Sequence, residues 1–258
     1  MWWWSAWPGV AFSSELKAVR HFWRILVSPE RTQWVVLGGG AILMAFYVYQ
    51  GHHSFFTAHL AEPLFGDDAY NDWYRHLYQF LCALLLLGLV PALLARFLLR
   101  RSLAFQGVRL GDWRFGLLAV GLGVVLVTPL LYLVSLDPEV QSEYPLTRLA
   151  GCSIDLFVLW QLSYLIYYIA WEYFFRGFTL FLLEERWGPG CALLYQIIPS
   201  TLLHIGKPQA ETFAAIFGGI LFAALALRTR SMLYPLILHW YVGACTDLFS
   251  IVNMTRAT

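Results

Sequence analysis

The sequence predicts an all-α polytopic membrane protein, a helix bundle of about seven transmembrane helices around a polar cavity within the membrane. Composition is the first reason, because 59% of the 258 residues are hydrophobic, only 13% are charged and the mean hydropathy is +0.61. A soluble globular domain has about 25% charged residues, so this chain lacks the polar surface that water requires. The other two reasons are a series of long apolar segments and the ionisable side chains inside them.

The apolar segments are long enough, or nearly so, to cross a hydrocarbon core about 30 Å thick. They cover residues 34–50, 76–99, 115–135, 153–183, 189–204, 211–227 and 231–253. The fifth and sixth are short, because about 16 residues of helix rise only ~24 Å. Their connection, HIGKPQAE at 204–211, is therefore expected to turn before it reaches the far surface. Irregular backbone at that depth is tolerated where protein buries it or water wets it, which implies a cavity.

The connections between these segments alternate in charge, and the alternation predicts an orientation. Basic residues precede the first segment and follow the second and sixth, whereas the connections after the first and third are acidic. The positive-inside rule then places the N-terminus in the cytoplasm, and we expect a multi-pass protein of a bacterial inner (plasma) membrane. Residues 1–33, with the cluster MWWWSAW, are expected to lie along the cytoplasmic surface as part of a single membrane domain, 1–258. The net charge of +1 and the lack of a basic stripe exclude nucleic acid as a partner.

Three of the segments carry polar side chains along one helix face. In the fourth, Glu172 and Arg176 are spaced i, i+4 and can form an ion pair. Each would cost about 2.5–3.5 kcal/mol alone at the centre of a membrane helix, so ionisable residues there indicate a functional site. A lone polar face in lipid is unfavourable, and we expect the three faces to meet. Their members are Gln161, Tyr168, Glu172, Arg176 and Thr179; Ser200 and His204; and His239, Gly243, Thr246, Asp247 and Ser250.

The depths of the ionisable side chains agree with a shared site. Counted from the cytoplasmic ends of their helices, Glu172, His204, His239 and Asp247 lie about 18, 22, 12 and 24 Å into the membrane. A carboxylate, two imidazoles and a guanidinium around an enclosed pocket supply a base, proton carriers and charge stabilisers for activating water. The alternative is a buried polar network that only specifies packing.

These residues resemble the CAAX protease and bacteriocin-processing family of intramembrane endopeptidases, which includes the type II CAAX prenyl endopeptidases. That family has two adjacent glutamates followed after three residues by Arg-Gly, then a helix ending in Phe-x-x-x-His, then His-x-x-x-Asn or Asp. Here WEYFFRG (171–177), STLLH (200–204) and HWYVGACTD (239–247) align with these motifs in order. The resemblance covers about residues 150–250, which would form the catalytic core.

The chain departs from the family pattern at three positions. Trp171 takes the place of the first glutamate, which the family uses with the first histidine to activate water. Ser200 replaces the phenylalanine, and Gly243 replaces the asparagine that joins the second histidine in binding the oxyanion. The segment HIGKPQAE resembles a variant subgroup in which WE replaces the double glutamate, so the change is compatible with an active enzyme.

The base that activates water has two candidates. Glu172 is the expected one, with Arg176 holding its carboxylate ionised and oriented. Glu211 is the rival, because it lies seven residues beyond His204 and can fold back into the cavity beside Lys207. Alternatively, Glu211 only begins the sixth helix, where a carboxylate suits the helix dipole.

The second histidine is expected to stabilise the developing oxyanion. In this interpretation His239 donates to the substrate oxygen, Gly243 admits the substrate backbone, and Asp247 orients the imidazole. Together with the base, this predicts an endopeptidase that uses activated water on a peptide bond near a membrane anchor or a lipidated C-terminal segment. Its partners would be a membrane-anchored or lipidated substrate and the lipid bilayer.

Other readings of the same residues stay open. A binding or immunity protein on the same scaffold would recognise a peptide without cutting it, and Trp171 is its best support. A transporter is favoured by the short fifth and sixth segments, although no inverted repeat is visible. No cofactor is favoured, but His204, His239 and a carboxylate from Glu172, Glu211 or Asp247 could furnish the three ligands of a catalytic zinc ion. His52, His53 and His59 are a second, weaker metal candidate, and the four cysteines are expected to be small core residues.

Overall fold

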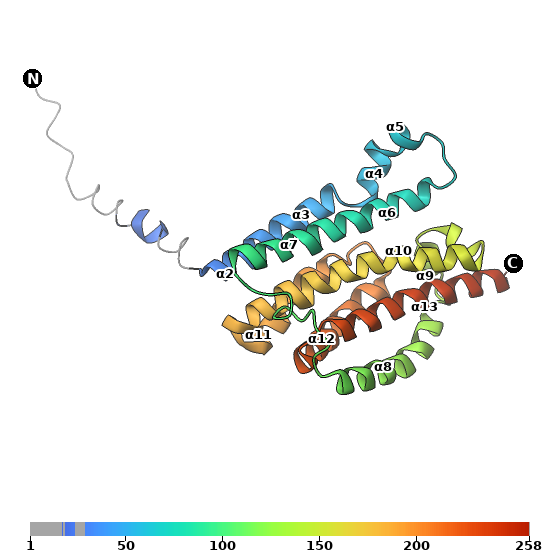
Figure 1. The fold of residues 1–258 in the computed structure, drawn as a ribbon. Coiled ribbons are helices and arrows are strands. Elements are labelled where there is room, and N and C mark those ends of the chain that lie inside the picture. Colours follow the sequence, from blue (N-terminus) through green and yellow to red (C-terminus); the bar gives the residue numbers. More distant parts are fainter. Residues whose placement is uncertain (1–16, 18, 24–28, 258) are drawn as a thin grey trace, which may run out of the picture.

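The computed structural model describes residues 17, 19–23 and 29–257, and in this part the chain is almost entirely helical (Figure 1). No β-strand occurs among the described residues, only an isolated bridge between Ile205 and Lys207. The all-α fold class is therefore confirmed. Most of the expected interfacial segment, residues 1–33, lies outside the described residues, so its placement along the membrane surface stays a prediction.

Six helices of the described chain are long and apolar enough to cross a membrane. The protein is a multi-pass integral membrane protein. The six helices are Arg31–Tyr49, Asn71–Leu98, Trp113–Val134, Ile154–Leu202, Gln209–Thr229 and Leu233–Arg256. The fourth has 49 residues, more than twice what a bilayer needs, and it is broken at Gly188, whose φ of 73° and ψ of 165° are not helical. Its two arms correspond to the fourth and fifth of the seven predicted segments.

The first two spans form a hairpin. The first consists of α2 (Arg31–Gln33), η1 (Trp34–Gly39) and α3 (Gly40–Tyr49). After α4 (His53–His59) and α5 (Ala61–Phe65), the chain returns through α6 (Asn71–Ala83), η2 (Leu84–Leu89), α7 (Val90–Leu93) and η3 (Leu94–Leu98). Figure 1 shows this hairpin along one side of the remaining helices.

The remaining helices form the body of the bundle. They are α8 (Trp113–Val134), α9 (Pro138–Glu143), η4 (Arg148–Gly151), α10 (Ile154–Glu172), η5 (Tyr173–Leu180), α11 (Phe181–Leu202), α12 (Gln209–Thr229) and α13 (Leu233–Ala257). Side chains cap three of them: Ser153 accepts from the Leu156 N–H at the start of α10, Asp112 from the Phe115 N–H at the start of α8, and Asp137 from the Glu139 N–H at the start of α9. These caps satisfy backbone donors that a helix start leaves unpaired.

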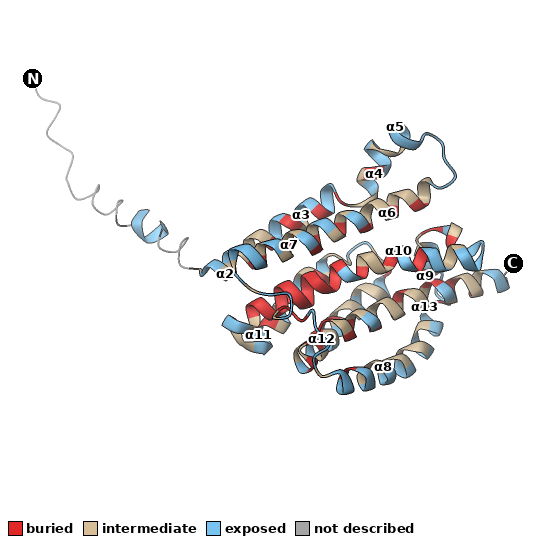
Figure 2. Ribbon diagram, viewed as in Figure 1, coloured by how far each residue is buried: buried red, intermediate tan, exposed pale blue. Residues whose placement is uncertain are grey.

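The buried centre of the molecule coincides with the fourth span. All eight residues of η5 are buried, and Figure 2 shows that α10, η5 and the start of α11 carry the most continuous buried stretch. The outer faces are apolar and exposed, as on α8, where Val125 and Leu126 are 70% and 67% exposed. A protein in water would hide such faces, whereas here they suit lipid. The buried centre is therefore where polar groups are shielded from both lipid and water.

The centre of the fourth span is a π-helix. In this geometry hydrogen bonds join residue i to i+5, and η1, η2 and η3 of the first two spans have it as well. The π-helix η5 begins directly after Glu172 and contains Arg176, so the ion pair spans the junction of α10 and η5. Gly177 allows close packing there, because a Cβ at this position would lie 3.1 Å from the Gln106 carbonyl oxygen.

Candidate active site

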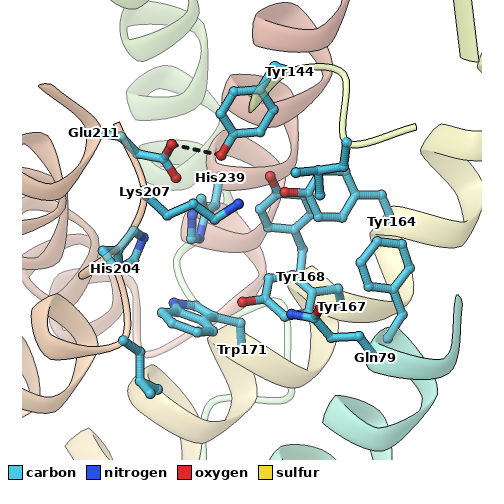
Figure 3. A pocket seen from close by; sticks show the side chains of 13 residues that line it. Gln79, Tyr144, Tyr164, Tyr167, Tyr168, Trp171, His204, Lys207, Glu211 and His239 are labelled. Atoms are coloured by element: carbon cyan, nitrogen blue, oxygen red, sulfur yellow. Dashed lines mark hydrogen bonds between the residues drawn. The ribbon is translucent and has the colours of Figure 1, made fainter. Parts of the chain in front are cut away.

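A small polar pocket lies among the helices at the level of the junction between α10 and η5 (Figure 3). Its volume is about 60 Å³, and a single water needs roughly 10–15 Å³, so it holds a few waters or a short part of a peptide. Residues from α6, α10, α12, α13 and the connections before α10 and α12 line it: Gln79, Phe80, Tyr144, Leu146, Tyr164, Tyr167, Tyr168, Trp171, Leu203, His204, Lys207, Glu211 and His239. The sequence-predicted His204, Glu211 and His239 therefore share one pocket.

Glu172 is the centre of a buried charge network beside this pocket. Its side chain is 0% exposed, and its Oε1 lies 3.1 Å from Nη1 of Arg176, which is 2% exposed. The same oxygen lies 2.6 Å from Nδ1 of His239. Glu172 is not among the residues that line the pocket. The predicted pairing of Glu172 with Arg176 is present, but the carboxylate is directed to Arg176 and His239 rather than to the cavity.

His204 is held by its own helix. Its Nδ1 lies 2.7 Å from the Ser200 carbonyl oxygen, so this nitrogen donates and the proton of a neutral ring resides on it. Burial lowers the pKa of His204, which lies in the connection between two candidate spans, and the ring is neutral at pH 7. Nε2 is then free to accept a proton in the pocket.

Glu211 presents its carboxylate to the pocket. It stands in the first turn of α12, and its Oε2 accepts a hydrogen bond of 2.7 Å from the Tyr144 hydroxyl (Figure 3). Lys207 also lines the pocket, but its Nζ pairs at 2.6 Å with Glu143 rather than with Glu211. The same ammonium lies 5.1 Å from the Tyr144 ring centroid. The connection after α8 thus supplies two groups that hold Glu211 and Lys207 in place.

Two expected roles on α13 do not agree with the contacts. Asp247 does not hydrogen-bond His239; its Oδ2 accepts from Trp160 Nε1 at 2.9 Å and from Gln161 Nε2 at 2.7 Å. Asp247 is two turns away from His239, about 12 Å along the helix, and Glu172 orients the imidazole instead.

Gly243 has a different neighbour from the one expected. The space in front of it is filled, because a Cβ there would lie 1.9 Å from the Tyr168 hydroxyl oxygen. Gly243 therefore admits this phenol from α10 rather than a substrate backbone. The Tyr168 ring in turn packs 4.8 Å from the His239 ring, centroid to centroid.

No three His, Cys, Asp or Glu side chains in the described part of the chain are grouped so that they could hold a metal ion. His204 and His239 share the pocket with Glu211, but none of the three carboxylates considered from the sequence completes a group of three ligands with them in the described chain. In the connection between the first two spans, the His52 ring lies 4.0 Å from the His53 ring, whereas His59 packs on Phe55. The four cysteines are free, but Cys152 and Cys191 are exposed, so the expectation that all four are core residues is wrong.

Sequence reasoning missed the tyrosines of the pocket. Tyr144, Tyr164, Tyr167 and Tyr168 all line it, and a phenol is an apolar ring with a donor at its tip. Tyr168 stood on the predicted polar face, whereas Tyr144 lies in a connection and no helical periodicity could place it.

A family model also matches this part of the chain. Residues 153–245 match the model described as type II CAAX prenyl endopeptidase Rce1-like. This region is therefore similar to that family. This confirms the resemblance to the CAAX protease and bacteriocin-processing family, while the subgroup with WE in place of two glutamates stays a prediction. Searches among curated proteins and among solved structures found no match.

Proposed function

We propose that this chain is an intramembrane endopeptidase that uses activated water to cut a peptide bond near a membrane anchor or a lipidated C-terminal segment. The observation that carries the proposal is the pocket shared by Glu211, His204 and His239, a carboxylate and two imidazoles, in a domain matched by the Rce1-like family model. Water hydrolysis of an amide needs a proton acceptor and a stabiliser of the oxyanion, and this set contains both.

Glu211 is the group that best fits the role of base. Its carboxylate lines the pocket, whereas Glu172 is enclosed and does not. A general base must lie within hydrogen-bond reach of the water that it deprotonates, directly or through one further water. His204 Nε2 accepts a second hydrogen bond from the same water and fixes its orientation.

In the proposed reaction, Glu211 takes a proton from water while the water oxygen bonds to the scissile carbonyl carbon. The carbonyl oxygen becomes an oxyanion beside His239. When the C–N bond breaks, the proton held by Glu211 passes to the departing amine, so the carboxylate is regenerated and the products are a carboxylic acid and an amine. No group other than water is consumed.

Glu172 supports this chemistry without touching the substrate. The Glu172 carboxylate lies 2.6 Å from Nδ1 of His239 and fixes the orientation of the imidazole, whose other nitrogen, Nε2, is proposed to bind the oxyanion. Arg176 pairs with the Glu172 carboxylate and fixes its position. The Glu172–Arg176 pair therefore positions the His239 imidazole. The cytoplasmic N-terminus proposed from the loop charges does not affect this role.

The proposal is tested with the full chain reconstituted in lipid vesicles. The probe is a fluorescence-quenched peptide that carries a prenylated cysteine followed by three residues, compared with a peptide of the same reporter attached to a transmembrane helix. Glu211→Gln removes the base and keeps the side-chain shape, so single-turnover cleavage should fall about 10²- to 10⁴-fold. Glu185→Gln is the matched control, since this carboxylate pairs with Arg101 away from the pocket.

The outcomes separate the competing functions. Cleavage by the parent chain together with loss in Glu211→Gln supports the proposal. If Glu211→Gln cleaves at the parent rate, the base is Glu172 or no carboxylate acts as the base. Tight binding of either peptide without any product would instead indicate the peptide-binding alternative, which Trp171 favours.

A further inference from the structure

Trp171 carries a buried hydrogen-bond donor that nothing in the described chain satisfies. The side chain is 2% exposed, and its Nε1 is buried with no hydrogen-bond partner. Indole N–H is a donor only, so it calls for an acceptor. Of the two other tryptophans at the α10–α13 interface, Trp160 donates to Asp247 and Trp240 donates to the Gln161 carbonyl. Leaving a buried N–H unpaired is unfavourable, so Trp171 is the exception that requires an explanation.

The unpaired N–H faces the pocket. Trp171 lines the cavity, and Figure 3 shows its nitrogen on the edge of the ring that faces His204, His239 and Lys207. The ring is fixed in this orientation from two sides. It stands perpendicular to the His204 ring at 5.2 Å, with an angle of 89°, and it contacts the Phe175 ring at 4.8 Å on the side of η5.

The acceptor that fits this position is the oxygen of the bond to be cut. The other polar groups that reach the pocket from the same side have other partners: His204 Nδ1 donates to the Ser200 carbonyl, Lys207 pairs with Glu143, and His204 Nε2 binds the attacking water in the proposed reaction. A neutral, rigid donor also suits an oxyanion, because it needs no reorientation when charge develops. We propose that the Trp171 indole N–H donates a hydrogen bond to the scissile carbonyl oxygen and holds the oxyanion together with His239. This inference rests on the proposed endopeptidase function.

The proposal gives Trp171 a chemical role different from that of a base. An indole cannot accept a proton from water, so this position contributes to the transition state only as a donor. The assigned role makes Trp171 a catalytic residue rather than a space-filling wall. It also predicts that an aromatic ring of the same size without the N–H does not suffice.

The test replaces the N–H and keeps the ring. In the first variant, Trp171 is replaced with benzothienylalanine, in which a sulfur atom stands where the N–H was; the second variant is Trp171→Phe. The control is Trp187→Phe, a ring that packs on Tyr195 at 5.5 Å and does not line the pocket. All are reconstituted in vesicles, and their melting temperatures are compared with that of the parent chain to check folding.

The probes are the prenylated reporter peptide and a phosphonamidate analogue that carries a tetrahedral phosphorus atom in place of the scissile carbonyl carbon. Both Trp171 variants should lose about 10²- to 10³-fold in single-turnover cleavage, with a similar loss of affinity for the analogue. Affinity for the uncut peptide should stay within about threefold of the parent value, and Trp187→Phe should behave as the parent.

The experiment distinguishes a failure of this inference from a failure of the proposed endopeptidase function. If the parent chain does not cut the peptide in the same preparations, the proposed function fails and this inference with it. If the parent chain cuts and the benzothienylalanine variant keeps its rate and its affinity for the analogue, the indole N–H is no oxyanion donor and only the inference fails. Equal losses of peptide and analogue affinity would also overturn it, because they would make Trp171 a general substrate contact.

Discussion

Removing the guanidinium of Arg176 is expected to destabilise the fold by about 3–5 kcal/mol, the usual cost of leaving one buried charge without its partner. The magnitude follows from the burial of the pair: Arg176 is 2% exposed and Glu172 is 0% exposed, with 3.1 Å between Nη1 and Oε1. The guanidinium also lies 5.6 Å from the Phe222 ring centroid, so its charge has a second favourable contact. Arg176→Met keeps much of the side-chain length and removes both contacts.

The assay is thermal unfolding of the purified chain in detergent micelles. For a chain of this size about 1 kcal/mol shifts the melting temperature by roughly 2–4 °C, so Arg176→Met should melt about 6–20 °C lower than the parent. Arg186→Met is the matched control, because Arg186 pairs with Glu30 where the two side chains are 45% and 51% exposed. Such surface pairs contribute about 0–1 kcal/mol, and the control should hardly shift.

A double variant tests whether the lost stability comes from the unpaired charge of Glu172. Replacing a whole buried pair is often close to neutral, so adding Glu172→Gln to Arg176→Met should recover part of the lost stability. Equal melting of Arg176→Met and the Arg186→Met control would refute the reasoning, because the buried pair would then contribute nothing. Additive losses in the double variant would show that each side chain acts through separate contacts.

Three further results are expected from the site. Trp171→Glu should lower single-turnover cleavage about 10²- to 10³-fold even with Glu211 intact, because it removes the indole donor, and an unchanged rate would contradict the role proposed for Trp171. His239→Ala should lower the cleavage rate about 10²- to 10³-fold while equilibrium peptide binding survives, and equal loss of both would make it a substrate-positioning residue. Gly243→Ala should lower the melting temperature, since its Cβ would lie 1.9 Å from the Tyr168 hydroxyl, and an unchanged melting curve would contradict this packing.

The helices were predictable from the sequence because their causes are local. Segments of about 20 apolar residues must be helical in lipid, and the spacing of Glu172 and Arg176 fixes them on one face whatever surrounds them. The break between the fourth and fifth segments was also local, since Gly188 adopts a positive φ that glycine tolerates and Pro189 follows it. The polar faces met as expected because lipid offers no alternative partner.

The pairing across helices was not predictable, because it depends on how far one helix slides along another. In the observed antiparallel register of α10 and α13, Gln161 meets Asp247, Tyr168 meets Gly243, and Glu172 meets His239. A shift of one turn, about 5.4 Å, would give each polar group a different partner without altering either helical face. The interpretation of Asp247 as the orienting group for the imidazole failed for this reason.

The position of the proposed base depends on a contact that the sequence does not reveal. Tyr144 stands 67 residues before Glu211, in a connection whose path no periodicity fixes, yet its hydroxyl holds the Glu211 carboxylate. Counting depth along the helices favoured Glu172, but depth does not distinguish a carboxylate that faces a cavity from one that is enclosed by an arginine and a histidine.

The difference between an enclosed Glu172 and a pocket-lining Glu211 changes how the tryptophan at position 171, in place of the family's glutamate, is understood. A second carboxylate at position 171 would stand next to Glu172 and share a pocket with Glu211, and like charges in a buried site raise each other's proton affinity. With Trp171 in place, Glu211 is the carboxylate of the pocket and Glu172 is neutralised by Arg176. Glu211 can then act as the proposed base beside His239, and position 171 is free to supply an uncharged donor. The departure from the family motif is therefore consistent with a site whose base comes from α12 and whose carbonyl-binding group comes from α10.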